Sequence, residues 1–187
     1  MRQLRNERGD TIIEVVMAVT LFSALAMSIM GLMNSGIAMA QRSLELTLVR
    51  GQVDTQAELL RYVRDQAYRG DDTYADLWKA LTARAVSRAD SMLNIARCPA
   101  TMPKQGFVLA AADDTVRMSS DAYEASPTYA RVEARRGTTV SLGVAIQLVK
   151  VEHGGAYDAY IQACWMSVGS DRPVTTGTIV RIYDAKA

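Results

Sequence analysis

Hydrophobic and polar residues are distributed very unevenly along this chain. Residues 15–41 run for 27 positions without one Asp, Glu, Lys or Arg. A helix needs about 20 apolar residues to cross a bilayer, so this stretch predicts a membrane-crossing helix. Arg2, Arg5 and Arg8 lie within residues 1–9, where Glu7 is the only acid. The positive-inside rule therefore keeps that end in the cytoplasm and places the rest of the chain outside.

Beyond this stretch the apolar spacing becomes that of an amphipathic helix. Apolar residues recur at three- and four-residue steps, and charged residues fall mostly on other faces. The apolar positions are Leu46, Val49, Val53, Ala57, Leu60, Val63 and Ala67. Residues 42–69 are therefore expected to lay one stripe on a globular head at 70–187. Gly70 is the expected helix end and Asp71 the next start, before a second helix over 73–95.

The remainder of the chain alternates like β-strands. Short strands are expected at 106–111, 115–118 and 129–134, and longer ones at 140–152, 157–168 and 174–183. His153-Gly154-Gly155 has the composition of a hairpin turn. The predicted fold class is α+β, in which a long N-terminal helix continues into an antiparallel β-sheet head.

Two ordinary explanations compete for the apolar stretch. A secretory signal peptide has a basic start, an apolar middle and a small-residue cleavage site, and Ala38-Met39-Ala40 before Gln41 fits such a site. Its apolar middle is usually about 7–15 residues, however, and this one is far longer. The other explanation is a permanent single-span anchor. Neither accounts for Asp10 and Glu14, two acids at the edge of the apolar stretch.

A third explanation rests on the residues around Gly9. A short basic leader ends in this glycine, and the sequence DTIIE then leads into the apolar helix. This order resembles the N-terminus of type IV pilins and pseudopilins, over residues 1 to 68. In that family a prepilin peptidase cuts after the glycine, the new amino terminus is N-methylated, and a glutamate is the fifth mature residue. The resemblance implies a leader at 1–9, cleavage between Gly9 and Asp10, methylation of Asp10, and a role in assembly for Glu14.

The chemistry of cleavage explains why Glu14 would be needed. Cutting creates an α-amine with a pKa of about 7.7–8.0 at the end of an apolar helix. That charge is costly in an apolar fibre core unless it is paired, and a carboxylate one helical turn on can meet a staggered neighbour's amine. The alternative is a capping box, because Thr11-x-x-Glu14 before an apolar run has that pattern.

Composition argues against most chemistry. The formal net charge is +1, from 21 basic and 20 acidic residues, so no bulk charge attracts nucleic acid. The single histidine, His153, and the two cysteines lack the spacing of a zinc site, and glycine-rich phosphate loops are absent. The acidic pairs at 71–72 and 113–114 could bind calcium, but acids in loops of this kind are usually solvated. We therefore expect no catalytic residue, no metal and no cofactor, and a protein that is not an enzyme.

Two smaller features remain. In an exported domain Cys98 and Cys164 imply one disulfide, and many pilins close a C-terminal loop in this way. Two buried free thiols are the alternative. The basic cluster of Arg131, Arg135 and Arg136 is more commonly a solvated strand end than a DNA-binding patch.

These expectations combine into one prediction. The chain is a prepilin-like subunit that assembles through its apolar helix, residues 10–41, into a type IV pilus or a type II secretion pseudopilus. Its expected partners are prepilin peptidase, other pilin subunits, the assembly platform with its ATPase, and the cytoplasmic membrane. The family usually has phenylalanine after the glycine, and the departure at Asp10 favours a minor subunit. The alternative is a membrane-tethered binding or adhesin domain that does not polymerise.

Overall fold

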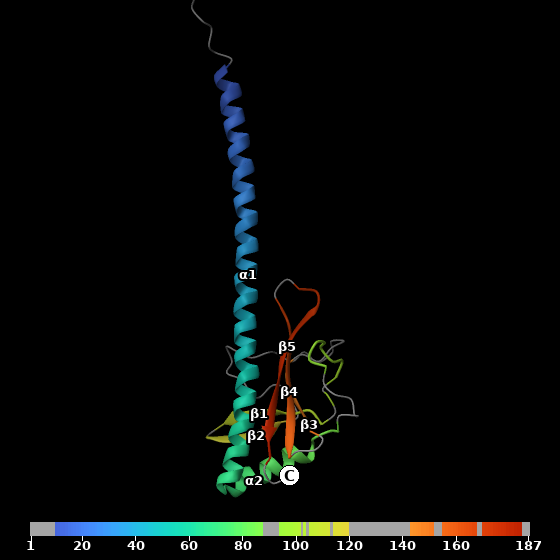
Figure 1. Ribbon diagram of the computed structural model, residues 1–187. Coiled ribbons are helices and arrows are strands. Elements are labelled where there is room, and N and C mark those ends of the chain that lie inside the picture. Colours follow the sequence, from blue (N-terminus) through green and yellow to red (C-terminus); the bar gives the residue numbers. More distant parts are fainter. Residues whose placement is uncertain are drawn as a thin grey trace, which may run out of the picture. The chain divides into compact units, whose positions relative to one another are not determined.

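The chain divides into two compact units, Met1–Ser43 and Leu44–Ala187. Helix α1 (Asp10–Arg69) begins in the first unit and ends in the second, which also holds two antiparallel sheets (Figure 1). The expected order of a long apolar helix followed by antiparallel strands is confirmed. The computed structural model describes residues 10–87, 94–101, 103, 105–112, 114–119, 143–151, 155–167 and 170–184.

The part of α1 that lies in the second unit buries one stripe, as its periodicity predicts. The buried residues of this stripe are Val49, Val53, Ala57, Leu60 and Val63, with Leu46, Leu59 and Ala67 partly buried beside them. The charged residues Arg50, Asp54, Glu58 and Arg61 are exposed. Burying each large apolar side chain contributes about 1.5–3 kcal/mol, so this stripe is a main contact of the head core.

Helix α1 ends, and the next helix begins, at the residues that the sequence predicts. Gly70 has φ +94°, a conformation that glycine adopts without steric cost. The Asp71 carboxylate then accepts hydrogen bonds from the backbone N–H groups of Thr73 and Tyr74, at 3.0 and 3.3 Å. It is the N-cap of helix α2 (Asp72–Ala83).

The expected length of this second helix is wrong. It ends at Ala83 rather than near residue 95. Val86 instead pairs with the main sheet, because its N–H donates to the Leu148 carbonyl and its carbonyl accepts from the Lys150 N–H, both at 2.9 Å. Residues 94–98 form turn and loop. A sheet edge thus supplies the backbone partners that a longer helix would have supplied.

The main sheet has the order β3-β4-β5, with both pairs antiparallel. Its strands are β3 (Gly143–Lys150), β4 (Ala156–Met166) and β5 (Pro173–Tyr183). One face carries the predicted alternating residues into the core with α1: Val144, Ile146, Leu148, Ala159, Ile161, Ala163 and Trp165. This part of the strand prediction is confirmed.

The expected single sheet is divided in two. Phe107 exchanges two backbone hydrogen bonds with Ile146, at 3.0 and 2.7 Å, but the chain then leaves β3. Among the described residues, strands β1 (Val108–Ala112) and β2 (Thr115–Ser119) pair only with each other, as a second sheet. The side-chain amide of Gln56 takes up the Leu109 N–H and carbonyl, at 2.8 and 2.9 Å. A glutamine side chain on α1 therefore supplies the hydrogen bonds to the β1 backbone that a neighbouring strand would otherwise supply.

Several expected features lie outside the described residues. These are the leader at 1–9, the strand at 129–134, the arginines at 131, 135 and 136, and His153 with Gly154 of the expected turn.

Candidate functional site

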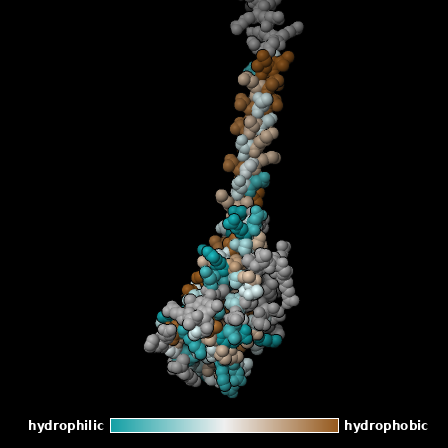
Figure 2. Space-filling view, turned by 90° about the vertical axis from the view of Figure 1, so that its right-hand side faces the viewer, coloured by the Kyte–Doolittle hydropathy of each residue, from teal (hydrophilic) through white to brown (hydrophobic). Residues whose placement is uncertain are grey.

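The first unit presents an apolar surface rather than a core. Every residue from 11 to 22 is exposed, and so are nearly all the others to 43. Phe22, Met27 and Leu32 are 73%, 74% and 74% exposed. Hydrophobic residues recur along the visible side of this segment, whereas hydrophilic residues are frequent on the visible face of the head (Figure 2). A continuous apolar surface of this kind marks a site that another apolar surface covers.

Four hydroxyl side chains within this surface are satisfied by the helix itself. The hydroxyl groups of Thr20, Ser23, Ser28 and Ser35 donate to backbone carbonyls three or four residues earlier, at 2.8–3.1 Å. In a lipid or protein interior an unpaired hydroxyl would cost several kcal/mol. These four residues therefore leave the segment compatible with apolar surroundings on all sides.

The length of the segment also suits a bilayer. The 27 uncharged residues from 15 to 41 span about 40 Å as a helix, at about 1.5 Å per residue. The hydrocarbon core is about 30 Å thick. The most apolar 18-residue window has no buried residue. The described residues thus contain one helix that is long and apolar enough to cross a membrane. A signal sequence near the N-terminus meets the same criteria of length and composition.

Glu14 is the only ionisable residue between positions 11 and 41. Its side chain is exposed, and no hydrogen bond or ion pair joins it to any other described residue. Thr11 lies within α1, so it does not occupy the N-cap position that the capping-box alternative requires. Asp10 is the first described residue of α1, and Gly9 lies outside the described residues.

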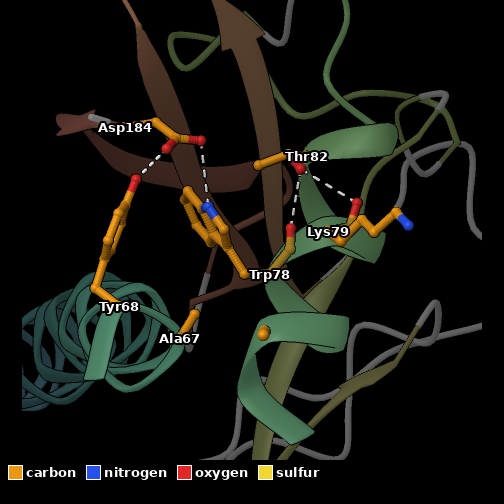
Figure 3. Close-up of a pocket in the computed structure, with 7 residues that line it drawn as sticks. Ala67, Tyr68, Trp78, Lys79, Thr82 and Asp184 are labelled. Carbon is orange, nitrogen blue, oxygen red and sulfur yellow. Dashed lines mark hydrogen bonds between the residues drawn. The ribbon is translucent and has the colours of Figure 1, made fainter. Parts of the chain in front are cut away.

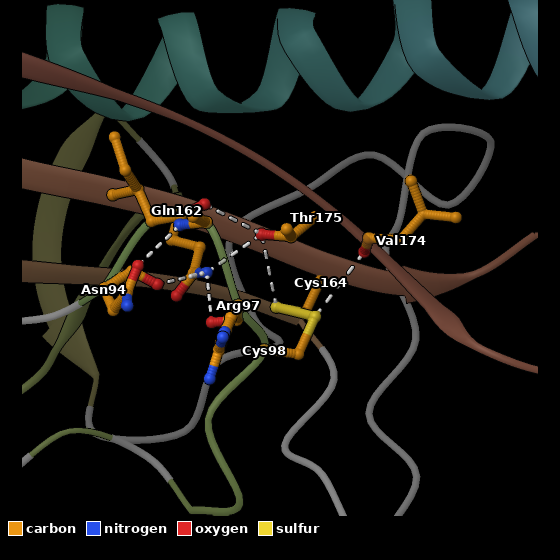
Figure 4. The surroundings of a disulfide bond; sticks show 9 residues. Asn94, Arg97, Cys98, Gln162, Cys164, Val174 and Thr175 are labelled. Atoms are coloured by element: carbon orange, nitrogen blue, oxygen red, sulfur yellow. Dashed lines mark hydrogen bonds between the residues drawn. A yellow bond between two sulfur atoms is a disulfide. The ribbon is translucent and has the colours of Figure 1, made fainter.

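A second candidate feature is the disulfide of the head. The structure joins Cys98 to Cys164, with the two Cα atoms 5.7 Å apart. Cys164 is on β4, and Cys98 follows the loop at 94–97, so the bond holds this loop against the sheet (Figure 4). The pairing is the one considered from the sequence, and the alternative of two free thiols is not what the structure contains.

The loop beside the disulfide is also held by a buried glutamine that the periodicity did not single out. The Gln162 amide nitrogen lies 3.1 Å from the Asn94 carbonyl, 2.8 Å from the Arg97 carbonyl and 2.9 Å from the Thr175 hydroxyl (Figure 4). The loop at 94–97 therefore covers Gln162 on the face of the sheet opposite α1. The alternating pattern of apolar and polar residues alone would predict that this face is exposed to solvent.

Gly177 allows this cover to approach closely. A Cβ atom at this position would lie 2.6 Å from the Ile161 carbonyl oxygen and 3.2 Å from the Ile95 Cβ. Since real Cβ atoms do not approach a backbone oxygen so closely, only glycine fits. The glycine in the sequence was a signal for such an approach.

One ion pair stabilises the same sheet. The Arg181 guanidinium on β5 donates two hydrogen bonds to the buried Asp158 carboxylate on β4, at 2.8 and 2.9 Å. The bonds to Asp158 and its negative charge raise the pKa of Arg181. The pair is a fixed strand-to-strand contact with both functional groups occupied.

Metal-binding geometry is lacking in the described part of the chain, where no three His, Cys, Asp or Glu side chains converge. Asp114 lies in the turn between β1 and β2 with φ +61°, a conformation that aspartate tolerates well in tight turns.

Comparison of the chain with protein-family models, curated proteins and solved structures finds no match.

Proposed function

We propose that this chain is a prepilin-like subunit, trimmed after Gly9 and assembled through its apolar helix into a type IV pilus or a type II secretion pseudopilus. The observation that carries the proposal is the surface of residues 11–43. It is mostly apolar and nearly all exposed, four of its hydroxyl groups are satisfied by the helix itself, and a single carboxylate, Glu14, lies near its start.

The apolar surface has two successive environments under this proposal. The bilayer covers it before assembly, and neighbouring copies of the same segment cover it in the fibre. In both, the backbone is satisfied because the segment is helical. Glu14 is exposed and makes no hydrogen bond or ion pair with another described residue, so it is available to a neighbour's α-amine at Asp10.

The head fits a position outside the cytoplasm. Disulfides persist in oxidising compartments and are rare in the cytosol, and the Cys98–Cys164 bond holds the loop at 94–98 to the sheet. The arginines at 2, 5 and 8 retain the leader on the cytoplasmic side, where the peptidase acts. Asp10, in place of the usual phenylalanine, favours a minor subunit over the abundant one.

Substitution of Glu14 tests the proposal. Glu14→Ala and Glu14→Gln should leave membrane insertion and head folding intact, because neither needs this carboxylate. Both should fail to enter fibres, since losing one half of a buried charge pair costs about 3–5 kcal/mol, or about two to four powers of ten in an equilibrium. The measurement is the ratio of fibre-borne to membrane-bound protein in cells that express each variant.

Two controls make the result specific. Asp76→Asn removes one negative charge from the exposed surface of α2 and should assemble normally. N-terminal sequencing of the wild-type fibre material should give Asp10 as the first residue, whereas a start at Gln41 indicates an ordinary signal peptide. Normal assembly of Glu14→Gln would exclude charge pairing. Absence of the wild-type protein from fibres would instead favour the membrane-tethered binding domain that does not polymerise.

A further inference from the structure

The two cysteines of the head lie on parts of the chain that other contacts also hold together. Cys164 is on β4 and is 2% exposed, whereas Cys98, which follows the loop at 94–97, is half-buried. The two residues are 66 positions apart in sequence, so in an unfolded chain the two thiols rarely meet. A contact that holds the loop on the sheet would bring them together before they are joined.

The loop at 94–97 forms a turn of its own. The Arg97 N–H donates to the Asn94 carbonyl at 3.1 Å, and the Ala96 N–H donates to the side-chain oxygen of Asn94 at 2.9 Å. Asparagine commonly supports tight turns through such side-chain bonds. Neither bond involves a sulfur atom, so the turn before Cys98 does not need the disulfide for its shape.

Gln162 on β4 and Thr175 on β5 bind this turn to the sheet. The amide N–H groups of Gln162 are shared between the carbonyl groups of Asn94 and Arg97, at 3.1 and 2.8 Å (Figure 4). The same amide donates to the Thr175 hydroxyl at 2.9 Å. Because Cys98 follows Arg97 directly, these bonds fix the backbone next to the cysteine.

Ile95 adds an apolar contact to these hydrogen bonds. Its carbonyl oxygen lies 3.3 Å from the Thr175 hydroxyl, and its side chain packs against Val149 and Tyr160. The Ile95 Cβ is only 3.2 Å from the place that a Cβ at Gly177 would take. Hydrogen bonds and an apolar side chain therefore hold the loop on the sheet independently of the disulfide.

The two sulfur atoms have different neighbours. Cys98 Sγ lies 3.6 Å from the Val174 carbonyl oxygen, to which a thiol S–H can donate. Cys164 Sγ lies 3.7 Å from the Thr175 hydroxyl oxygen (Figure 4). A Cys164 thiolate can accept a hydrogen bond from this hydroxyl. The reduced head would thus have a more accessible cysteine in the loop and a buried one with a donor beside its sulfur.

We propose that Gln162 and Thr175 are positioning residues for formation of the disulfide. They hold Cys98 against Cys164 in the folded, reduced head, so that oxidation joins two cysteines that are already in place. Cys98 is the cysteine that meets the oxidant, and Cys164 is the one that closes the bond. This inference does not depend on assembly through the apolar helix.

The oxidant is a disulfide, carried by a small thiol compound or by another protein. The Cys98 thiolate attacks one of its sulfur atoms, releases the other as a thiolate, and forms a mixed disulfide. The Cys164 thiolate then attacks Cys98 Sγ and releases the second thiolate. The two cysteines thereby lose two electrons to the oxidant, and their two protons pass to the solvent or to the released thiolates.

Single-cysteine variants test the order of the two cysteines. The full chain in detergent micelles is mixed with oxidised glutathione, and mass spectrometry follows the glutathione adduct over time. Cys98 in Cys164→Ser should react at least about tenfold faster than Cys164 in Cys98→Ser, because access to the sulfur limits exchange. The difference should disappear in urea that unfolds the head.

The closing step tests the positioning residues. Wild type and variants are reduced with a phosphine, freed of it and mixed with oxidised glutathione, and quenched samples are separated by mass into reduced, mixed and closed forms. Gln162→Leu and Thr175→Val should slow conversion of the mixed form to the closed form at least about tenfold. Attachment of glutathione to Cys98 should not be slowed, whereas a general loss of structure would not affect the closing step alone.

Two matched variants serve as controls. Gln56→Leu removes another buried glutamine, which bonds to the backbone of Leu109. Thr82→Val removes another half-buried hydroxyl, which donates to the carbonyl groups of Trp78 and Lys79 in its own helix (Figure 3). Both controls should close the disulfide at the wild-type rate.

Three results would overturn the inference. The first is a reduced wild-type head whose tryptophan fluorescence equals that of the urea-unfolded chain. The second is glutathione that reaches Cys164 as fast as Cys98 in the folded head. The third is a closing step that is as fast in Gln162→Leu and Thr175→Val as in the two controls. If Gln162→Leu does not fold, the Thr175→Val result decides.

Discussion

The two halves of helix α1 use apolar residues in opposite ways. Leu25 in the first half is 63% exposed, and Leu60 in the second half is fully buried. In residues 11–43 apolar side chains surround the helix, whereas in residues 44–69 they form one stripe and the charged residues take the other faces. One continuous backbone helix thus joins a surface suited to apolar surroundings to a surface suited to a water-soluble core.

Polar groups show the same difference. In the first half, hydroxyl groups such as that of Ser28 donate to carbonyls of their own helix. In the second half, the Gln56 amide bonds to the backbone of β1, 53 residues later in the chain. These hydroxyl groups of the first half are therefore bonded within their own helix, whereas the stability of the second half depends on tertiary contacts.

Removal of the disulfide should cause the largest loss of head stability while leaving the first half of α1 unaffected. Cys98 and Cys164 are 66 residues apart, and closing a loop of that size contributes about 4 kcal/mol in the chain-entropy model. Cys98→Ala combined with Cys164→Ala should lower the free energy of unfolding of the head by about that amount. Both tryptophans lie in the second unit, so urea unfolding in detergent, followed by their fluorescence, measures it.

The first half of α1 serves as the internal control for the disulfide. Circular dichroism at urea concentrations that unfold the head should still show the helix of residues 11–43. Loss of all helical signal in a single transition would show that the two halves of α1 unfold together. It would contradict the expectation that the first half stays helical without the folded head.

A matched pair of leucine substitutions sharpens the comparison. Leu60→Ala should destabilise the head by about 2–5 kcal/mol, because it removes a buried side chain and leaves a cavity. Leu25→Ala makes the same chemical change on the exposed half and should leave head stability within about 0.5 kcal/mol. The same fluorescence-detected unfolding applies to both. An equal loss in Leu25→Ala would mean that the first half packs on the head.

The parts of the fold that could be predicted depend on residues close in sequence. The stripe around Val53 and Leu60 follows from helical periodicity, and the inward face of β4 follows from alternation. The Gly70–Asp71 boundary follows from capping chemistry. Each of these requires only local spacing and one apolar core.

The parts that were missed depend on distant partners. Val86 leaves the helical pattern because β3 offers backbone partners, and nothing near Val86 in the sequence indicates this. Gln162 is buried because the disulfide loop covers it. Asp184 becomes part of a pocket because α1, α2 and the end of β5 meet there. Tertiary contacts override local propensity in each case.

Two glutamines one helical turn apart provide the smallest and most specific test. Both side chains are buried on the second half of α1, with Gln52 6% and Gln56 2% exposed. Gln56 pairs with the N–H and carbonyl of Leu109, whereas the Gln52 amide nitrogen and oxygen have no hydrogen-bond partner among the described residues. Gln56→Leu should cost about 1–3 kcal/mol, since it leaves buried backbone groups of Leu109 unpaired. Gln52→Leu should be neutral or stabilising, because it replaces a buried unpaired amide by an apolar group of similar size. Urea unfolding of both variants beside the wild type measures the difference, and a loss above about 1 kcal/mol in Gln52→Leu would show that the Gln52 amide is bonded in solution.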